Sequence, residues 1–442
     1  MIKWLQMLAV KLFKTALLVY NPSVKPTLEV HLIWICIACK ILDSSYGSFE
    51  QGKAGFSSGL NSALAMKGVI VMGKALPNLN PSELKQHGAV VAEPLSGFPL
   101  HVRGSVIGEA SKISKAQFGK LLKLVTNHLS SVPNIFVHDG AIGSLPNCDA
   151  KVRVISDSPS ATLSLSNLLC KTNARSISHD TCPLTVYVAT SISSSLMKAI
   201  SVEYQSNNGF VAADIERSSL VLCHKAFSDA STIKKALSAL SEPVISARGG
   251  IPLRGRILVS GDSVFVLFAA EDTIQSCANF LVSTDAGIIL SPQSVAPLFQ
   301  TGNTGGSNIF KLPAAIVLVS SDSSECIPSI SKLSPGQAAS HFLAGYQNGN
   351  FVPSFNHAPS CIDPLELAKA LLAKLKDNQI SAYLININKG GKTLSVKDFV
   401  KLVESTLSKD VPPFYAKGGD LKRKYKAFLS EKYPRLPEEF SF

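Results

Sequence analysis

The stretch that most constrains the fold of this chain is residues 261–281, GDSVFVLFAAEDTIQSCANFL. Its first part, VFVLF at residues 264–268, has the continuous apolar character of a buried strand, and apolar residues recur at helical spacing from Thr273 onward. A strand, a tight turn and a helix start in this order form the frame of a mononucleotide site, because free backbone N–H groups at the turn hold phosphate oxygens. The stretch therefore predicts an α/β fold that contains such a frame.

The turn of this frame, AAEDTIQS at residues 269–276, lacks the residues that hold phosphates. A phosphate loop needs glycines, which let the backbone approach the phosphates, and a Lys followed by Ser or Thr. This turn has neither glycine nor lysine, and Glu271 and Asp272 place two carboxylates where they would repel a polyphosphate. Two other interpretations of the acidic pair stay open: it caps the helix and interacts with the helix dipole, or it holds a cation.

Composition narrows the class of protein. A chain of 442 residues with 46% apolar and 17% charged residues has the length for two or three well-packed domains. The net charge of +12 comes from scattered basic residues, and no RNP, KH or finger pattern accompanies it, so no nucleic-acid partner is expected. The one basic cluster, at residues 422–426, is interpreted as a solvated helix face.

Cysteine usage and the N-terminal segment bear on location. The nine cysteines are odd in number and lack framework spacing, which favours a reducing compartment and a cytoplasmic protein. Cys36 and Cys39 have CxxC spacing without a second pair, so no zinc site is expected. The apolar run at residues 32–39 is shorter than the about 20 residues that span a bilayer, so no membrane association is expected. Residues 1–50 differ from the rest of the chain and are either a transit peptide or a poorly ordered extension.

Regular α/β alternation is expected from about residue 60. The chain has the patterns of strands at residues 68–72, 134–139, 151–155 and 314–320, and of helices at residues 115–129, 158–169, 229–240 and 364–377.

Several segments of the second half carry a family resemblance. Residues 330–338, ISKLSPGQA, and residues 341–346, HFLAGY, resemble a specific segment of the ATP-dependent phosphoenolpyruvate carboxykinase family. NKGGKTLSVKD at residues 388–398 is similar to the adenine-side segment of that family, and residues 251–268 to the strand before its phosphate loop. The resemblance covers most of residues 130–408, with gaps, and family members are longer than this chain.

The resemblance implies a two-domain α/β fold with mixed sheets around a cleft and a shortened nucleotide-binding part. The expected parts are an extension at residues 1–59, an N-terminal domain at 60–217, a degenerate mononucleotide-binding domain at 218–415 and a basic tail at 416–442. It also implies the gluconeogenic reaction of the family, in which oxaloacetate and ATP give phosphoenolpyruvate, ADP and carbon dioxide. That reaction uses Mg²⁺ with the nucleotide and Mn²⁺ as a second metal, because cations neutralise the transferring phosphoryl group.

The metal-binding positions of the family are only partly kept. By resemblance Lys235, the second of two adjacent lysines, is the candidate catalytic residue and metal ligand, and Asp285 is a second metal ligand. Arg254 stands where the family has a histidine ligand, and an arginine that stays protonated cannot bind a metal. The alternative for Lys234 and Lys235 is an ordinary solvated helix face.

The nucleotide-binding positions have also changed. Gln275 stands where the phosphate-loop lysine belongs, Ser276 where a metal-binding hydroxyl belongs, and Thr273 lies in the same loop. Thr393 replaces an arginine that covers the adenine, whereas Leu394 keeps an apolar contact with the base. The substrate-gripping arginine near the family's N-terminus has no counterpart.

Two histidine–aspartate pairs suggest a nucleophile at first sight. Neither His138–Asp139 nor His179–Asp180 is accompanied by a GxSxG elbow, so both pairs are interpreted as ordinary polar residues at strand ends.

Two functional hypotheses follow from the resemblance and the losses. The first is a carboxykinase of impaired or altered activity, with oxaloacetate and ATP as ligands. The second is a non-catalytic protein that uses the fold to bind or regulate a protein partner, such as a genuine carboxykinase.

Overall fold

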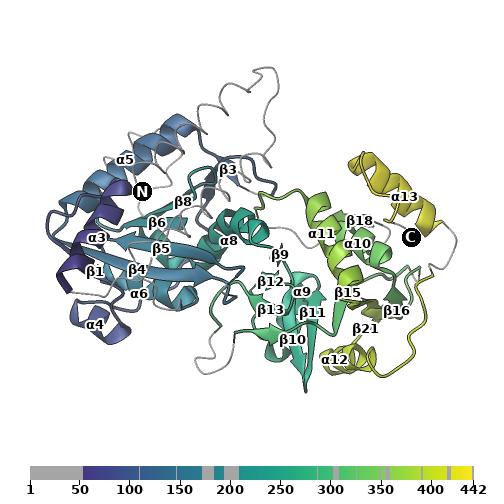
Figure 1. Cartoon of the computed structure of the whole chain (residues 1–442). Helices are drawn as coiled ribbons and strands as arrows, with labels where there is room; N and C mark the ends of the chain where they lie inside the picture. Colours follow the sequence, from purple (N-terminus) through teal and green to yellow (C-terminus); the bar gives the residue numbers. More distant parts are fainter. Residues whose placement is uncertain are drawn as a thin grey trace, which may run out of the picture. The chain divides into compact units, whose positions relative to one another are not determined.

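The structure is a computed structural model that describes residues 53–440 except 109, 146, 172–183, 194–208, 286, 302–307, 325, 348–349, 354–358, 390–391 and 416–419 (Figure 1). The first 52 residues, with Cys36 and Cys39, and the His179–Asp180 pair therefore lie outside the described residues. No helix in the described part of the chain is both long enough and apolar enough to cross a membrane.

The first half forms an eight-stranded mixed sheet with the strand order β1-β4-β5-β6-β8-β7-β2-β3. Strands β5, β6 and β8 run parallel, whereas β4 and β7 are antiparallel to their neighbours β5 and β8. The strands are β1 (Lys74–Pro77), β2 (Leu100–Arg103), β3 (Ser111–Lys112), β4 (Asn134–Ile142), β5 (Ala150–Ser156), β6 (Leu184–Ala189), β7 (Gly209–Asp214) and β8 (Ser219–His224). The central strands are almost wholly buried, which explains their unbroken apolar runs.

Helices cover both faces of this sheet. One face packs against α3 (Lys53–Met66) and α5 (Lys115–Ser131), and the other against α6 (Pro159–Leu168) and α8 (Ala230–Ala247). Two shorter helices, α4 (Pro81–Gln86) and the 3-10 helix η2 (Lys225–Ser228), complete this half. Ser114 and Ser158 cap α5 and α6 with their side chains, and the cap at Ser158 was expected from the sequence.

The second half is built on a five-stranded sheet with the order β10-β11-β15-β19-β16. Strands β11, β15 and β19 are parallel, and the two outer strands are antiparallel to their neighbours. The strands are β10 (Arg256–Ser260), β11 (Ser263–Phe268), β15 (Ala315–Ser320), β16 (Ile330–Leu333) and β19 (Ser381–Asn386). One face packs against α10 (Pro335–Leu343), α11 (Pro364–Asp377) and α13 (Leu421–Lys432), and the other against α9 (Glu271–Ser276) and α12 (Val396–Ser405).

A four-stranded antiparallel sheet contributes to the cores of both halves. It consists of β14 (Phe310–Lys311), β13 (Ser294–Pro297), β12 (Ile288–Leu290) and β9 (Ile251–Leu253), in that order. Because side chains alternate along a strand, Ile288 and Leu290 join the core of the second half, whereas Ile289 joins a core of the first. The remaining elements are the 3-10 helix η3 (Ala278–Phe280) and two hairpins, β17 (Ala344–Gln347) with β18 (Asn350–Pro353) and β20 (Asn388–Lys389) with β21 (Lys392–Thr393).

The predicted fold class is confirmed: the chain is a mixed α/β protein with several mixed sheets. One predicted strand, at residues 68–72, is wrong, because the strand of this region is β1, which begins at Lys74.

Candidate functional site

The corner between β11 and α9 is where the sequence predicts a degenerate phosphate loop. The helix begins at Glu271, two residues earlier than the apolar spacing predicts, and ends after six residues. The polar groups of this corner are hydrogen-bonded to one another. The Thr273 N–H donates to the Asp272 carboxylate at 2.7 Å, and the Ser276 hydroxyl donates to the Thr273 carbonyl at 2.7 Å. The Gln275 amide donates to Glu271 Oε1 at 2.7 Å. Thr273, Gln275 and Ser276 thus all have partners within the helix itself.

Arg256 links this corner to the preceding strand. Its Nη2 donates to Glu271 Oε2 at 3.0 Å, while Nε and Nη1 donate to the carbonyls of Thr284 (2.9 Å) and Arg254 (3.1 Å). The Arg256 side chain is 7% exposed, whereas that of Glu271 is 65% exposed. Burial lowers the pKa of the Arg256 guanidinium, and the neighbouring Glu271 carboxylate opposes that shift.

Arg254, which by resemblance stands where a histidine ligand is expected, is paired with Glu242 of α8. Its Nη2 lies 2.6 Å from Glu242 Oε1 and also donates to the Pro359 carbonyl at 3.0 Å. The other Glu242 oxygen accepts from the Ser360 hydroxyl (2.7 Å) and the Cys361 N–H (3.1 Å). Both side chains are at least nine-tenths buried, and a buried carboxylate persists only with such a full set of partners.

Lys234, and not Lys235, reaches Asp285. The Lys234 ammonium lies 2.5 Å from Asp285 Oδ2 and 5.8 Å from the centre of the Phe299 ring. Lys235 follows it on α8 and is exposed. Consecutive helical residues do not face the same side, so α8 can direct only one of the two lysines toward Asp285. The structure therefore does not bring the two predicted metal ligands, Lys235 and Asp285, together.

These three ion pairs form one neutral group of charges, which we call the internal ion-pair cluster. The charges of Arg254, Glu271 and Asp285 all act on Arg256, which shows that the pairs are neighbours. The cluster consists of Lys234, Arg254 and Arg256 as cations and Glu242, Glu271 and Asp285 as anions.

The cluster does not fit the divalent cations that the family uses. A permanently charged guanidinium cannot ligate a metal, and an ammonium already occupies the Asp285 carboxylate. In the described part of the chain, no group of three or more His, Cys, Asp or Glu side chains is arranged to hold a metal ion. The corner between β11 and α9 has no glycine and carries the Glu271 carboxylate, so it does not fit the phosphates of a nucleoside triphosphate.

The predicted adenine contact lies on the β20–β21 hairpin. Leu394 is half-buried, and its N–H donates to the Ile387 carbonyl at 2.8 Å; the neighbouring Thr393 is exposed. These contacts fix the backbone after β19 and leave the predicted role of Leu394 a prediction.

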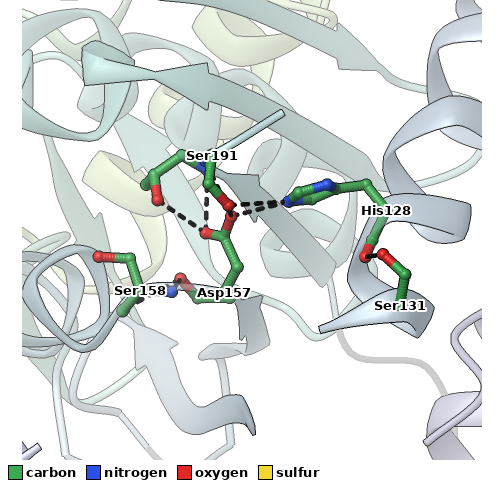
Figure 2. A network of polar contacts seen from close by, with 7 residues as sticks. His128, Ser131, Asp157, Ser158 and Ser191 are labelled. Carbon is green, nitrogen blue, oxygen red and sulfur yellow. Dashed lines mark hydrogen bonds and ion pairs between the residues drawn. The ribbon is translucent and has the colours of Figure 1, made fainter. Parts of the chain in front are cut away.

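Sequence reasoning missed a second polar network, centred on Asp157 at the end of β5 (Figure 2). Its carboxylate accepts from the N–H and hydroxyl groups of Thr190 and Ser191, and His128 Nε2 lies 3.0 Å from Oδ2. A nucleophilic triad needs serine and aspartate at different ring nitrogens, whereas Ser191 Oγ (3.2 Å) and Asp157 both lie at Nε2. The network therefore joins α5 to the ends of β5 and β6, and its members are too far apart in sequence to form a motif.

The fold and this site define a class: an α/β protein with the strand–turn–helix frame of a mononucleotide site. The family model of phosphoenolpyruvate carboxykinase matches residues 106–269 and 293–411, well over half of the chain. The chain belongs to the phosphoenolpyruvate carboxykinase family. The unmatched residues 270–292 between the two segments include α9 and Asp285.

Curated relatives match over short segments. The phosphoenolpyruvate carboxykinase (ATP) of Flavobacterium johnsoniae is 29% identical over 131 residues, which are 27% of this chain and 24% of the relative. The Leptospira biflexa enzyme of the same name is 32% identical over 110 residues (22% and 21%). That of Christiangramia forsetii is 34% identical over 119 residues (24% and 22%). The matches thus span less than a quarter of each of these relatives.

Proposed function

We propose that this chain is a non-catalytic member of the phosphoenolpyruvate carboxykinase family that serves as a binding or regulatory partner. The observation that carries the proposal is the internal ion-pair cluster. Three of its charged side chains, Arg254, Glu271 and Asp285, stand at positions that the family resemblance assigns to the metal or the phosphates, and each is paired with another side chain. The reaction named for the relatives depends on cations that neutralise a transferring phosphoryl group, and the cluster has no net charge to offer one.

The magnitude of the expected loss favours inactivity over mild impairment. Removing one preorganised charge-stabilising group lowers a rate by about a hundredfold or more. By resemblance this chain has lost three such groups: a metal ligand where Arg254 stands, the phosphate-loop lysine where Gln275 stands, and the substrate-gripping arginine, which has no counterpart. The alternative is residual carboxykinase activity on oxaloacetate and ATP, with Lys235 and Ser276 as remaining ligand contacts. The proposal also includes a cytoplasmic location. The six cysteines that the structure describes are all free thiols, which supports a reducing compartment.

A thermal-shift titration of the full chain with Mg-ATP, Mn²⁺ and oxaloacetate tests the proposal. A ligand that binds only the folded state raises the melting temperature by mass action. We expect no saturable shift at millimolar nucleotide and no oxaloacetate-dependent formation of phosphoenolpyruvate. The Flavobacterium johnsoniae relative, carried through the same titration and assay, is the positive control. A saturable shift of several degrees with Mg-ATP, followed by measurable turnover, would establish the alternative.

A mixing experiment with a genuine carboxykinase tests whether that enzyme is the protein partner. If the chain acts on a genuine carboxykinase, the purified chain added in excess changes the activity or the elution volume of that enzyme. An enzyme from the same cell that is unaffected in both measurements would contradict that choice of partner.

A further inference from the structure

Arg256 is buried, yet Glu271, the one carboxylate within ion-pair distance of it among the described residues, is exposed. The guanidinium is 7% exposed and held in place by the carbonyls of Thr284 and Arg254, whereas the Glu271 side chain is 65% exposed. A buried cation needs an anion. The carboxylate that pairs with Arg256 belongs to a water-exposed side chain, so water competes for it and weakens its hold on the guanidinium.

The two oxygens of the Glu271 carboxylate are held by two different donors. Oε2 accepts from Arg256 Nη2 at 3.0 Å, and Oε1 accepts from the Gln275 amide at 2.7 Å. A cation and a neutral amide that converge on one carboxylate form a recognition site for that group. Glu271 thus shows which chemistry the site accepts, because its own side chain is bound there.

We propose that Arg256 and Gln275 bind the carboxylate of a small organic acid, without a metal ion, in competition with Glu271. The Glu271 side chain has room to leave, since most of its surface faces water. Lys234 and the Asp285 carboxylate, which is also partly exposed, lie beside Arg256 and offer a second exchangeable pair for a dicarboxylate. The inference rests on the proposed function in one respect: it assumes that the internal ion-pair cluster holds no divalent cation when the acid binds.

The competition makes an unusual prediction: removing an acidic side chain strengthens the binding of an acid. An intramolecular competitor lowers the apparent affinity by the fraction of molecules in which the site is open. We expect Glu271→Ala to tighten succinate binding by about fivefold or more, because a tethered group acts at an effective concentration in the millimolar range. Arg256→Lys keeps the charge but loses the planar guanidinium, and we expect it to weaken succinate binding by about tenfold.

The experiment is isothermal titration calorimetry of the full chain with succinate, at fixed ionic strength and with EDTA present. Glu366→Ala is the matched control, because Glu366 also lies in the first turn of a helix, is 62% exposed and forms an ion pair with Lys369 at 2.8 Å. We expect it to bind succinate like the unchanged chain. Circular dichroism verifies that each variant is folded, and the Glu271→Ala comparison decides the matter even if Arg256→Lys does not fold.

Three outcomes would overturn the inference: equal succinate affinity in Glu271→Ala and the unchanged chain, an equal gain in Glu366→Ala, or tighter binding of inorganic phosphate than of succinate in Glu271→Ala. Because the titration contains neither nucleotide nor divalent metal, its failure leaves the proposed loss of catalysis untouched. Turnover of oxaloacetate with Mg-ATP would in turn contradict the proposed function without bearing on the succinate result.

Discussion

At the scale of single residues, Arg254 shows how one substitution changes the chemistry of a site. The family resemblance places Arg254 where a histidine ligand is expected, but no sequence pattern shows which anion would pair with its charge. Glu242 is twelve residues earlier, on another element, and only the packing of α8 against β9 brings the two together. For the same reason the sequence could not tell Lys234 from Lys235, since the choice depends on how α8 is rotated against its neighbours.

Breaking the Glu242–Arg254 pair should be costly. Glu242→Ala leaves the Arg254 guanidinium buried without its carboxylate, and we expect a loss of about 3 to 5 kcal/mol in the free energy of unfolding. Replacing both residues, as Glu242→Leu with Arg254→Met, should recover most of that loss because no buried charge is left unpaired. Urea denaturation followed by circular dichroism measures both variants. A single variant as stable as the unchanged chain would show that the pair is hydrated and not buried.

Asp157 should make the stability depend on acid. Burial by itself raises the pKa of this carboxyl, but the hydrogen bonds from His128, Ser191 and Thr190 outweigh it and hold the pKa below its usual value of 3.8. A carboxyl with a lowered folded-state pKa contributes stability above the unfolded-state pKa, and this contribution is lost as the pH falls through the folded-state pKa. We therefore expect Asp157→Asn to be less stable at pH 7 and to approach the unchanged chain below pH 3.8. Thermal melts at several pH values test this, and a difference that does not shrink on acidification would contradict it.

At the scale of elements, helices that bury one face lie where the sequence pattern predicts them. Where contacts with the rest of the fold determine whether an element forms or where it begins, the sequence pattern is a poorer guide. The amphipathic patterns at residues 115–129 and 364–377 were sufficient to place α5 and α11. The predicted strand at residues 68–72 fails because only Val69 is buried: Ile70 and Met72 are more than half exposed. Likewise, α9 begins early because Arg256 and Gln275 both bind Glu271, which favours helical backbone at that residue.

The contact between α10 and α13 should also depend on pH. His341 of α10 lies 2.9 Å from the Tyr425 hydroxyl of α13, measured at Nδ1, and burial lowers the pKa of the imidazole to about 3. A histidine that is neutral when folded and charged when unfolded contributes stability above the unfolded pKa of 6.5, and that contribution declines as the pH falls toward 3. We expect part of the acid destabilisation in this range to disappear in His341→Gln. Urea unfolding at pH 7 and pH 4 gives the comparison; an unchanged pH dependence in the variant would rule out His341 as the cause.

At the scale of the whole molecule, the four-stranded sheet contributes side chains to the hydrophobic cores of both halves. Ile288, Leu290 and Ile289 alternate between them, so unfolding one half removes packing from the other. The strands at residues 288–290, 294–297 and 310–311 were not among those predicted from the sequence, and period-two alternation says nothing about what lies on either side of a strand.

Residues 53–440 should therefore unfold in a single cooperative transition. Both tryptophans of the chain lie within residues 1–50, so residues 53–440 contain no tryptophan whose fluorescence could follow their unfolding. Far-ultraviolet circular dichroism and tyrosine absorbance should instead give coincident melting curves. Two separate transitions would show that the shared sheet does not couple the halves.

The internal ion-pair cluster also bears on how this lineage can change. Introducing histidine at position 254 would leave the buried Glu242 carboxylate without its cation, so this step toward a metal site is unfavourable when taken alone. Several substitutions would have to occur together before any of them helped. The three ion pairs therefore make a divalent-metal site at this place in the fold difficult to reach by single substitutions.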